Sequence, residues 1–314
     1  MPGEPLSGVF APVLTPFKQD LSIDKPAHLQ FCKWLLANNA GLAIFGTNSE
    51  ANSLSVAERL ELLDNLVSHG IPASRLVPGT GASALPDTIT LTRAALQAGT
   101  AAVLMLPPFF YKNVSEDGVF ASYAEVIERI ADRKLKILLY HIPKLSGVPI
   151  TLPLIARLLS RYPGTIAGLK DSSGDIANTL SVIREFPQLR VFCASESLLL
   201  ETMRNGGAGC ISACANVNPA AIGKLYQSWQ SPQAEALQAS LNPVRGIFES
   251  RPMIAALKAA AAGFGQYPNF SIVRPPLVSF DKGRTEGLMS ALAEAQFAMP
   301  GLAGHLANKV IQRV

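Results

Sequence analysis

The stretch Ile166-Ala167-Gly168-Leu169-Lys170-Asp171 is an apolar run that ends in two charged residues. Its length and composition are typical of a strand buried in a parallel sheet. Seven more runs of this kind occur along the chain, and longer segments with apolar residues at helical spacing separate them. The eight predicted strands comprise residues 9–14, 42–45, 76–79, 102–106, 136–141, 166–171, 190–194 and 209–213.

Segment 55–69 is an example of the helical connections, because its apolar residues recur at intervals of three or four. Ser55 and Glu58 have the spacing of a capping box, in which a hydroxyl and a carboxylate satisfy free amides at a helix start. Three further helix starts are predicted at Asp175, Ser197 and Asn218.

Eight strand–helix units predict an α/β fold of the (β/α)₈ TIM-barrel type. Residues 1–230 would form the barrel, and residues 231–314 a C-terminal helical extension packed on it. Within the extension, Ala-rich segments predict helices at 233–248 and 253–262. The alternative is an open doubly wound sheet, which is disfavoured because no G-x-G-x-x-G motif follows the first strand.

The composition excludes several classes of partner. Hydrophobic residues make up 48% of the chain and charged residues 16%, which favours a large buried core. The net charge is only +4 without a long basic run, so we expect no nucleic-acid partner. The longest apolar run, residues 101–110, is shorter than the roughly 20 residues that span a membrane, so we expect no membrane partner. The cysteines have no zinc or disulfide spacing and predict buried thiols of a cytoplasmic protein; they are Cys32, Cys193, Cys210 and Cys214.

Lys170 is the strongest candidate for chemistry, because active sites of TIM barrels lie at the carboxyl ends of the strands. Burying an ammonium ion is costly, so an inward-facing Lys170 would favour its neutral amine, a nucleophile towards ketones. Side chains alternate along a strand, so Gly168 would also face inward and leave room for the lysine stem or a ligand. The alternative is a lysine whose amine reaches solvent at the rim.

Two other groups of residues are predicted to lie beside Lys170. Tyr140 lies in the preceding strand, near its end, and a phenol there can move protons between the amine and a substrate. Thr47 and Asn48 follow the second strand, where hydroxyl, amide and backbone N–H groups can hold a carboxylate. The alternatives are an ordinary core tyrosine and simple helix capping.

The sequence has no motif typical of a metalloenzyme or a serine hydrolase. It contains neither an H-E-x-x-H motif nor a G-x-S-x-G elbow. We therefore expect no metal and no organic cofactor. No metal-binding spacing relates the four histidines, which are His28, His69, His141 and His305.

In this order, the motifs resemble those of the dihydrodipicolinate synthase and N-acetylneuraminate lyase family of pyruvate-type aldolases. The resemblance extends from about Gly8 to Leu277 and implies a (β/α)₈ barrel with a helical extension, assembled as a homotetramer. The segments that carry it are Ala11-Pro12-Val13-Leu14-Thr15-Pro16-Phe17, Gly46-Thr47-Asn48-Ser49-Glu50, Tyr140-x-x-Pro143, Gly168-Leu169-Lys170-Asp171, Gly206-Gly207-Ala208-Gly209-Cys210-Ile211-Ser212, Ala215-Asn216-Val217 and Arg274-Pro275-Pro276-Leu277.

The resemblance also implies roles for individual residues. Lys170 would form a Schiff base with a small 2-oxo acid, and Tyr140 would transfer the protons. Thr47 and Asn48 would hold the carboxylate of the acid. The remaining substrate contacts expected at this site are Ser172, Ser195 and Ile211.

Three departures from the family pattern bear on the activity. Ser49 replaces the second glycine of G-x-x-G-E, which would alter the turn or add a hydroxyl. Leu145 stands where the synthases carry an arginine that binds the carboxylate of the aldehyde substrate. The tyrosine that a neighbouring subunit contributes to proton transfer would fall at Phe110, and adjacent Tyr111 is the predicted replacement.

These observations predict a lyase that cleaves a 4-hydroxy-2-oxo acid to pyruvate or glyoxylate plus an aldehyde. Because leucine cannot pair with a carboxylate, Leu145 predicts a substrate whose far end is neutral or hydroxylated. The alternatives are a sugar-acid dehydratase, a hydratase-aldolase or a true dihydrodipicolinate synthase. A non-catalytic barrel that binds a 2-oxo acid is disfavoured, because Lys170 and Tyr140 are both present.

Overall fold

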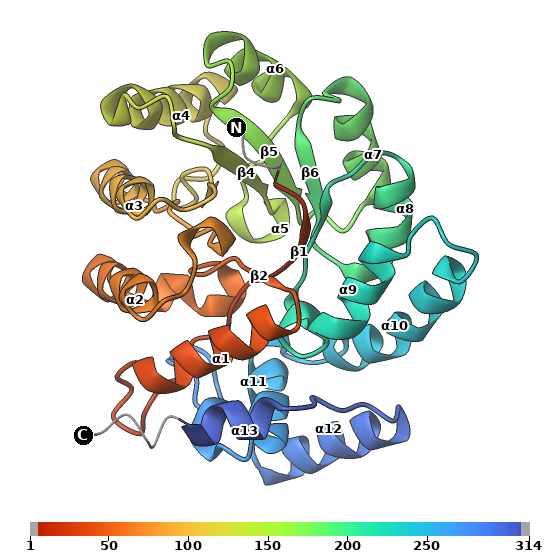
Figure 1. Ribbon diagram of the computed structural model, residues 1–314. Coiled ribbons are helices and arrows are strands. Elements are labelled where there is room, and N and C mark those ends of the chain that lie inside the picture. The colour runs from red at the N-terminus through yellow and green to blue at the C-terminus, as the bar shows by residue number, and fades with distance from the viewer. Residues whose placement is uncertain (1–5, 309–314) are drawn as a thin grey trace.

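A computed structural model describes residues 6–308, and one curled parallel β-sheet forms its centre (Figure 1). Seven strands pair in the order β2-β1-β7-β6-β5-β4-β3, and each overlaps a predicted apolar run. The strands are β1 (Gly8–Ala11), β2 (Gly41–Leu42), β3 (Val103–Met105), β4 (Ile137–His141), β5 (Ile166–Asp171), β6 (Arg190–Cys193) and β7 (Gly209–Ile211).

Segment 76–79, the remaining predicted strand, lies between β2 and β3 and closes the barrel. The Val77 N–H donates to the Leu42 carbonyl at 2.9 Å, and the Leu104 N–H donates to the Pro78 carbonyl at 2.9 Å. Pro78 has no N–H of its own, so the segment pairs through isolated bridges rather than as a regular strand. The predicted (β/α)₈ barrel is therefore confirmed.

Helices surround the sheet in Figure 1. Those of the barrel layer are α1 (Lys25–Ala37), α2 (Val56–Ser68), α3 (Leu85–Gln97), α4 (Glu116–Ile130), α6 (Leu152–Arg161), α7 (Ile176–Glu185), α8 (Leu199–Arg204) and α9 (Pro219–Gln227). The short helix α5 (Pro143–Ser146) lies in the loop after β4. Short 3₁₀ helices lie in the loops and are η1 (Thr47–Ser49), η2 (Ala51–Ser53), η3 (Ala73–Arg75), η4 (Glu196–Leu198), η5 (Ala213–Asn216) and η6 (Pro268–Ser271).

The capping box at the start of α2 is confirmed. The Glu58 N–H donates to Ser55 Oγ at 3.2 Å, and the Ser55 N–H donates to Glu58 Oε2 at 2.8 Å. The predicted start at Ser197 is wrong, because this residue lies inside η4 and donates its N–H to the capping hydroxyl of Ser195. The two other starts are confirmed at Asp175 and Asn218.

Up to residue 308, where the described part of the chain ends, four α-helices follow the barrel and form the C-terminal extension, which includes both predicted Ala-rich helices. We propose a division at residue 230, between α9 and the first of these helices, because α9 ends the eighth strand–helix unit. In Figure 1, α10 lies beside α8 and α9, whereas α13 packs against α1. The helices are α10 (Ala234–Glu249), α11 (Met253–Phe264), α12 (Lys282–Glu294) and α13 (Leu302–Ala307).

Alternation along the strands divides the core into two layers. Leu139 and Leu169 pack outward against the helices, and Asp171 turns the same way to accept a hydrogen bond from Thr179 of α7 at 2.7 Å. The barrel interior holds a smaller apolar cluster, to which Phe10, Ala43, Val77, Ala102, Leu104, Leu138, Tyr140, Phe192, Ala208 and Ile211 belong.

Gly168 does not make room for a lysine stem or a ligand, as the sequence suggested. A Cβ at this position would lie 2.1 Å from the carbonyl oxygen of Arg190 and 2.8 Å from Leu138 Cδ2. The missing side chain instead allows β5 and β6 to approach closely, while Leu138 fills the interior space.

A buried ion pair connects the extension to the barrel. Lys258 of α11 donates to Glu50 Oε1 at 2.6 Å and to the carbonyl of Thr15 at 2.8 Å, and neither charged side chain is exposed. The second oxygen of Glu50 accepts the N–H of Arg274 at 2.9 Å. Burial lowers the pKa of Lys258 to about 8, although Glu50 opposes this shift. The contact with Glu50 at 2.6 Å therefore favours the charged form of the lysine, which burial alone would disfavour.

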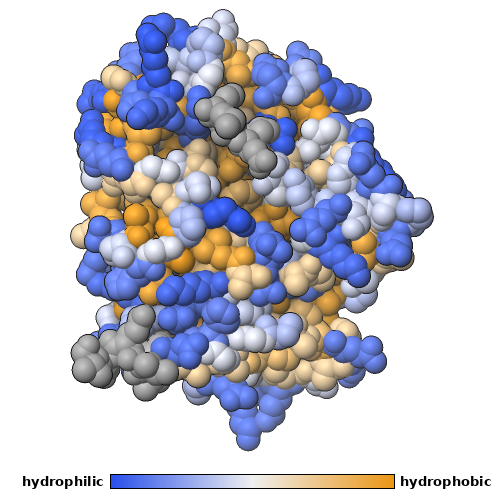
Figure 2. All heavy atoms as spheres, in the orientation of Figure 1, coloured by the Kyte–Doolittle hydropathy of each residue, from blue (hydrophilic) through white to orange (hydrophobic). Residues whose placement is uncertain are grey.

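The surface carries both hydrophilic and apolar residues. Figure 2 shows hydrophilic side chains over the outer helices, with apolar residues between them toward the middle of this face. Within residues 6–308, no helix has the length and apolar character needed to cross a membrane.

Replacing Lys258 by methionine should lower the free energy of unfolding by roughly 3–5 kcal/mol, because Glu50 would remain as a buried, unpaired charge. The double change Lys258→Met with Glu50→Gln should recover much of this loss, since no buried charge then remains. Urea denaturation followed by circular dichroism measures both effects. The matched control is Lys282→Met, which breaks an exposed pair with Glu286 and should change stability by about 0.5 kcal/mol or less. Wild-type stability of the Lys258→Met variant would contradict the role of this pair.

Candidate active site

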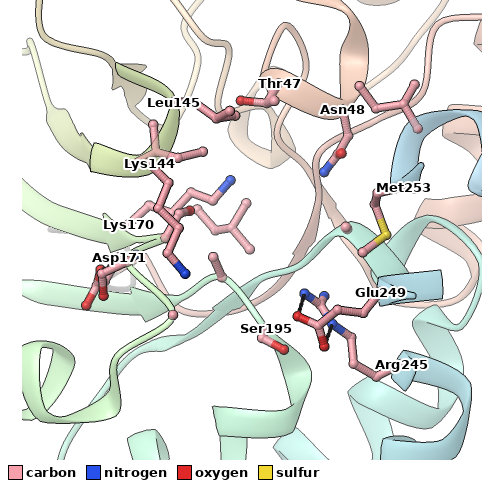
Figure 3. A pocket seen from close by; sticks show the side chains of 18 of the residues that line it. Thr47, Asn48, Lys144, Leu145, Lys170, Asp171, Ser195, Arg245, Glu249 and Met253 are labelled. Atoms are coloured by element: carbon pink, nitrogen blue, oxygen red, sulfur yellow. Dashed lines mark hydrogen bonds and ion pairs between the residues drawn. The ribbon is translucent and has the colours of Figure 1, made fainter. Parts of the chain in front are cut away.

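A cavity of about 550 Å³ opens at the carboxyl ends of the barrel strands (Figure 3). Its volume lies within the roughly 300–1,000 Å³ of typical small-molecule sites. One wall comes from strand ends and the loops that follow them, and the other comes from α10, the start of α11 and residues 277–278. The cavity lies where barrel enzymes place their reacting groups.

Lys170 and Tyr140 meet inside this cavity. They are register partners on the adjacent strands β5 and β4, and both are 3% exposed. Lys170 Nζ donates to the Tyr140 hydroxyl at 3.2 Å, and Thr47 Oγ1 lies 3.0 Å from the same hydroxyl. The prediction that Tyr140 stands beside Lys170 is confirmed.

The surroundings of Tyr140 make its phenol more acidic than usual. Burial alone would raise its pKa, but the Lys170 charge and hydrogen bonds from Thr47, Lys170 and Ser172 outweigh burial and lower the pKa. A phenol in this state gives up and recovers a proton more readily. The arrangement can therefore support proton transfer next to an amine.

The turn after β2 presents Thr47 and Asn48 to the cavity as the first residues of η1. The N–H groups at the start of a helix are not used by the helix itself. Ser49, which departs from the family pattern, faces the protein: its hydroxyl accepts the Gly46 N–H at 3.1 Å. We expected Ser49 either to alter the turn or to add a hydroxyl, and the structure shows the added hydroxyl contact.

The cavity brings together all but one of the predicted site residues. Ser172, Ser195 and Ile211 all line it, and Ile211 lies at the end of β7. Tyr111 does not line the cavity of its own chain and is 71% exposed, with its ring edge-to-face with that of Phe110 at 5.4 Å. Its predicted catalytic role therefore requires a neighbouring copy of the chain.

Sequence reasoning missed the second wall of the cavity. Arg245 and Glu249 of α10 line it, as does Met253 at the start of α11. A signal was present, because Arg245 follows the buried residues Gln238 and Leu241 at helical spacing. A cation on the inward face of a helix needs a partner or a ligand.

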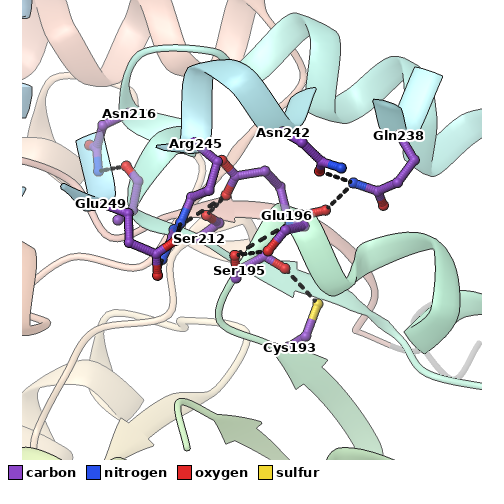
Figure 4. A network of polar contacts seen from close by, with 11 residues as sticks. Cys193, Ser195, Glu196, Ser212, Asn216, Gln238, Asn242, Arg245 and Glu249 are labelled. Atoms are coloured by element: carbon purple, nitrogen blue, oxygen red, sulfur yellow. Dashed lines mark hydrogen bonds and ion pairs between the residues drawn. The ribbon is translucent and has the colours of Figure 1, made fainter. Parts of the chain in front are cut away.

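Arg245 belongs to a polar network at the edge of the cavity (Figure 4). Its guanidinium lies 3.5 Å from Glu196 Oε2, and Glu196 also accepts a hydrogen bond from Ser212. Burial opposes the charged form of Arg245, but Glu196 and Glu249 outweigh burial and raise its pKa. Arg245 therefore remains cationic next to the cavity.

No metal site accompanies these residues. Across residues 6–308, no group of three or more His, Cys, Asp or Glu side chains is placed to hold an ion. The four cysteines are buried and free, as the sequence predicts. Burial raises the pKa of Cys193 to about 12, so it remains a thiol.

A (β/α)₈ barrel with a cavity at its strand ends defines a class of barrel protein with room for a small-molecule ligand. Comparison with known families gives the more specific assignment. The model of the dihydrodipicolinate synthetase family matches residues 5–295, and the chain belongs to this family.

Individual relatives agree with this assignment. A DapA-like lyase of Chloroflexus aurantiacus is 35% identical over 292 residues, which cover 90% of this chain and 95% of the relative. The crystal structure of dihydrodipicolinate synthase from Agrobacterium tumefaciens has a TM-score of 0.86 at 29% identity and covers 92% of this chain and 99% of that one. YagE of Escherichia coli K12, a prophage protein of the same family solved in complex with pyruvate, has a TM-score of 0.84 at 26% identity, covering 93% and 99% of the two chains.

Proposed function

We propose that this protein is a lyase that forms a Schiff base between Lys170 and a 2-oxo acid. The proposed reaction cleaves a 4-hydroxy-2-oxo acid to pyruvate plus an aldehyde, which is glyoxylate where C4 carries a carboxylate. The observation that carries this proposal is the 3.2 Å contact between Lys170 Nζ and the Tyr140 hydroxyl inside the cavity. Membership of the family and the pyruvate complex of YagE support it.

The first half of the proposed reaction forms the imine. The neutral amine of Lys170 attacks the C2 ketone, a C–N bond forms, and the ketone oxygen takes a proton from Tyr140. The attacking nitrogen next gives a proton to the Tyr140 phenolate, and Tyr140 passes it to the C2 hydroxyl. The hydroxyl leaves as water, which gives a protonated imine beside the Tyr140 phenolate. Thr47, at 3.0 Å from the phenol, would hold its hydroxyl in position during these transfers.

The second half breaks the carbon–carbon bond. The C3–C4 bond cleaves, and its electron pair moves into the protonated imine to give an enamine. At the same time the C4 hydroxyl loses its proton to the Tyr140 phenolate, and C4 becomes the carbonyl of the aldehyde. Protonation at C3 and hydrolysis of the imine then release the 2-oxo acid and free Lys170. The imine itself accepts the electrons, so the mechanism requires neither a metal nor an organic cofactor.

The substrate carboxylate would lie on the turn after β2. Thr47 and Asn48 both face the cavity there and bring hydroxyl, amide and backbone N–H donors without a cationic side chain. Ser172, Ser195 and Ile211 would complete the surroundings of the bound acid. Preorganised donors of this kind hold the acid so that its ketone faces Lys170.

True dihydrodipicolinate synthase activity is the main alternative, because a synthase is among the related structures. Leu145 argues against binding of the aldehyde substrate in the way the synthases bind it, since the loop after β4 presents this uncharged side chain to the cavity. Expulsion of water instead of an aldehyde would use the same imine. Product analysis separates these outcomes, because only the aldolase releases an aldehyde together with the 2-oxo acid.

We also propose that the protein assembles into a homotetramer and is located in the cytoplasm. Phe110 and Tyr111 are each 71% exposed, and Val114 nearby is 39% exposed. Aromatic side chains exposed together mark a surface that another molecule can cover. Contact with a second copy would bury them and bring Tyr111 towards a neighbouring cavity.

Incubation with pyruvate and borohydride should place a reduced adduct on Lys170, because the reductant fixes the imine. Peptide mass spectrometry locates the adduct, and Lys170→Ala should abolish it. The internal control is Lys258, a second buried lysine that does not line the cavity and is paired with Glu50. An adduct on Lys258, or no adduct with any 2-oxo acid, would refute the mechanism.

Tyr140→Phe should lower kcat for retro-aldol cleavage by roughly 10²–10⁴-fold, the usual loss when an acid–base group is removed. The fold should persist, because only one hydroxyl is lost. Tyr123→Phe is the matched control: this tyrosine is equally buried, but its hydroxyl donates to the Met105 carbonyl outside the cavity. Near-normal turnover of Tyr140→Phe would mean that another group, such as Tyr111 of a neighbouring copy, moves the protons.

Sedimentation at micromolar concentration should show a tetramer. Replacing Phe110 and Tyr111 together by serine should shift the distribution towards smaller species, because the aromatic contact is lost. A wild-type protein that sediments as a monomer would contradict the assembly and the role of Tyr111.

A further inference from the structure

One wall of the cavity carries a cation, Arg245, that the proposed reaction does not use. Figure 3 shows Arg245 and Glu249 on one side of the cavity, with Lys144 and Leu145 on the other. The Arg245 side chain is 12% exposed, so its guanidinium is largely withdrawn from solvent. A charge held in this way at the wall of a substrate cavity is a candidate for ligand recognition.

The present partners of Arg245 hold it loosely. Its nitrogens lie 3.4 Å from each oxygen of Glu249 and 3.5 Å from Glu196. Well-formed bonds between a guanidinium and a carboxylate are shorter, at about 2.7–2.9 Å. The donors of Arg245 are therefore available to an anion that can approach more closely.

The two acidic partners differ in how easily they can leave. Glu196 is 2% exposed and also accepts a hydrogen bond from Ser212, so it is a fixed, buried counter-ion. Glu249 is 63% exposed, so its carboxylate can turn into water at little cost in solvation. An incoming carboxylate would thus replace Glu249 and leave the pair with Glu196 intact.

We propose that Arg245 binds a terminal carboxylate on the aldehyde half of the substrate, in the place that the Glu249 carboxylate now occupies. This inference rests on the proposed Schiff-base reaction at Lys170 and names the substrate class as 4-hydroxy-2-oxo acids with a second carboxylate. It replaces the expectation of a neutral or hydroxylated far end, which rested on Leu145. The guanidinium reaches the cavity from α10 rather than from the loop after β4.

Lys144 is the competing anchor, because it also lines the cavity. Its side chain is exposed, and its ammonium is a point charge that does not reproduce the two-pronged geometry of a guanidinium. Glu249 already presents both of its oxygens to Arg245, which shows that a carboxylate fits there. The geometry therefore favours Arg245.

Two matched pairs of substrates test the inference. Each pair differs only in a terminal carboxylate or methyl group: 4-hydroxy-2-oxoglutarate with 4-hydroxy-2-oxopentanoate, and 4-hydroxy-2-oxohexanedioate with 4-hydroxy-2-oxohexanoate. The measurement is kcat/KM for pyruvate release. The wild type should prefer the dicarboxylate in at least one pair, and the absence of any preference would overturn the inference.

The variants identify the residue responsible. Arg245→Met combined with Glu196→Gln removes the cation without leaving a buried charge, and should lower the preference by roughly 10- to 100-fold, the loss expected for a charge-assisted pair. Glu196→Gln alone retains Arg245 and should keep the preference. Arg251→Met is the matched surface control, because Arg251 lies just beyond α10 and does not line the cavity. Loss of the preference in Lys144→Met instead would overturn the assignment to Arg245.

Glu249→Gln gives an independent result that does not depend on the folding of the double variant. Removing the competing carboxylate should lower KM several-fold for the dicarboxylate and leave KM for the methyl analogue unchanged. An unchanged KM for both substrates would overturn the displacement of Glu249. Borohydride trapping with pyruvate distinguishes failure of this inference from failure of the proposed function. An enzyme that forms the adduct on Lys170 but shows no preference for the dicarboxylate refutes only this inference. An enzyme that forms no adduct refutes the proposed function and this inference together.

Discussion

Parallel pairing of β4 with β5 is the constraint on which the candidate site depends. The register aligns Tyr140 with Lys170, and side-chain alternation turns both into the barrel interior while Leu139 and Leu169 pack against the helices. A shift of one residue between the two strands would turn one of these side chains into the outer layer and separate the pair. The chemistry proposed here therefore depends on a backbone register that the apolar core enforces.

The buried cationic side chains of the protein have different hydrogen-bond partners. Lys258 faces Glu50, and Arg245 faces Glu196, so each has a carboxylate counter-ion. The hydrogen bond from Lys170 goes to a phenol, while the adjacent Asp171 turns away towards α7. A carboxylate holds an ammonium ion in its charged form, whereas a phenol can exchange protons with it. This contrast fits a reactive role for Lys170 and a structural role for Lys258.

The C-terminal extension contributes to the site as well as to stability. The pair between Lys258 and Glu50 fixes α11 on the turn that also presents Thr47 and Asn48. The helix before it, α10, closes the cavity with Arg245 and Glu249. In the proposed reaction the strand ends would supply the reacting groups, and the extension would supply the wall that selects the substrate.

The sequence by itself determined the eight segments that close the barrel and the pair Lys170 and Tyr140. Those features are local, because apolar runs, strand alternation and position at a strand end can all be followed along the chain. Only the tertiary structure placed Arg245 in the cavity, paired Lys258 with Glu50 across 208 positions, and assigned Gly168 to the contact between β5 and β6. These features depend on how distant segments pack, and a helix pattern predicts an inward face without specifying what that face meets.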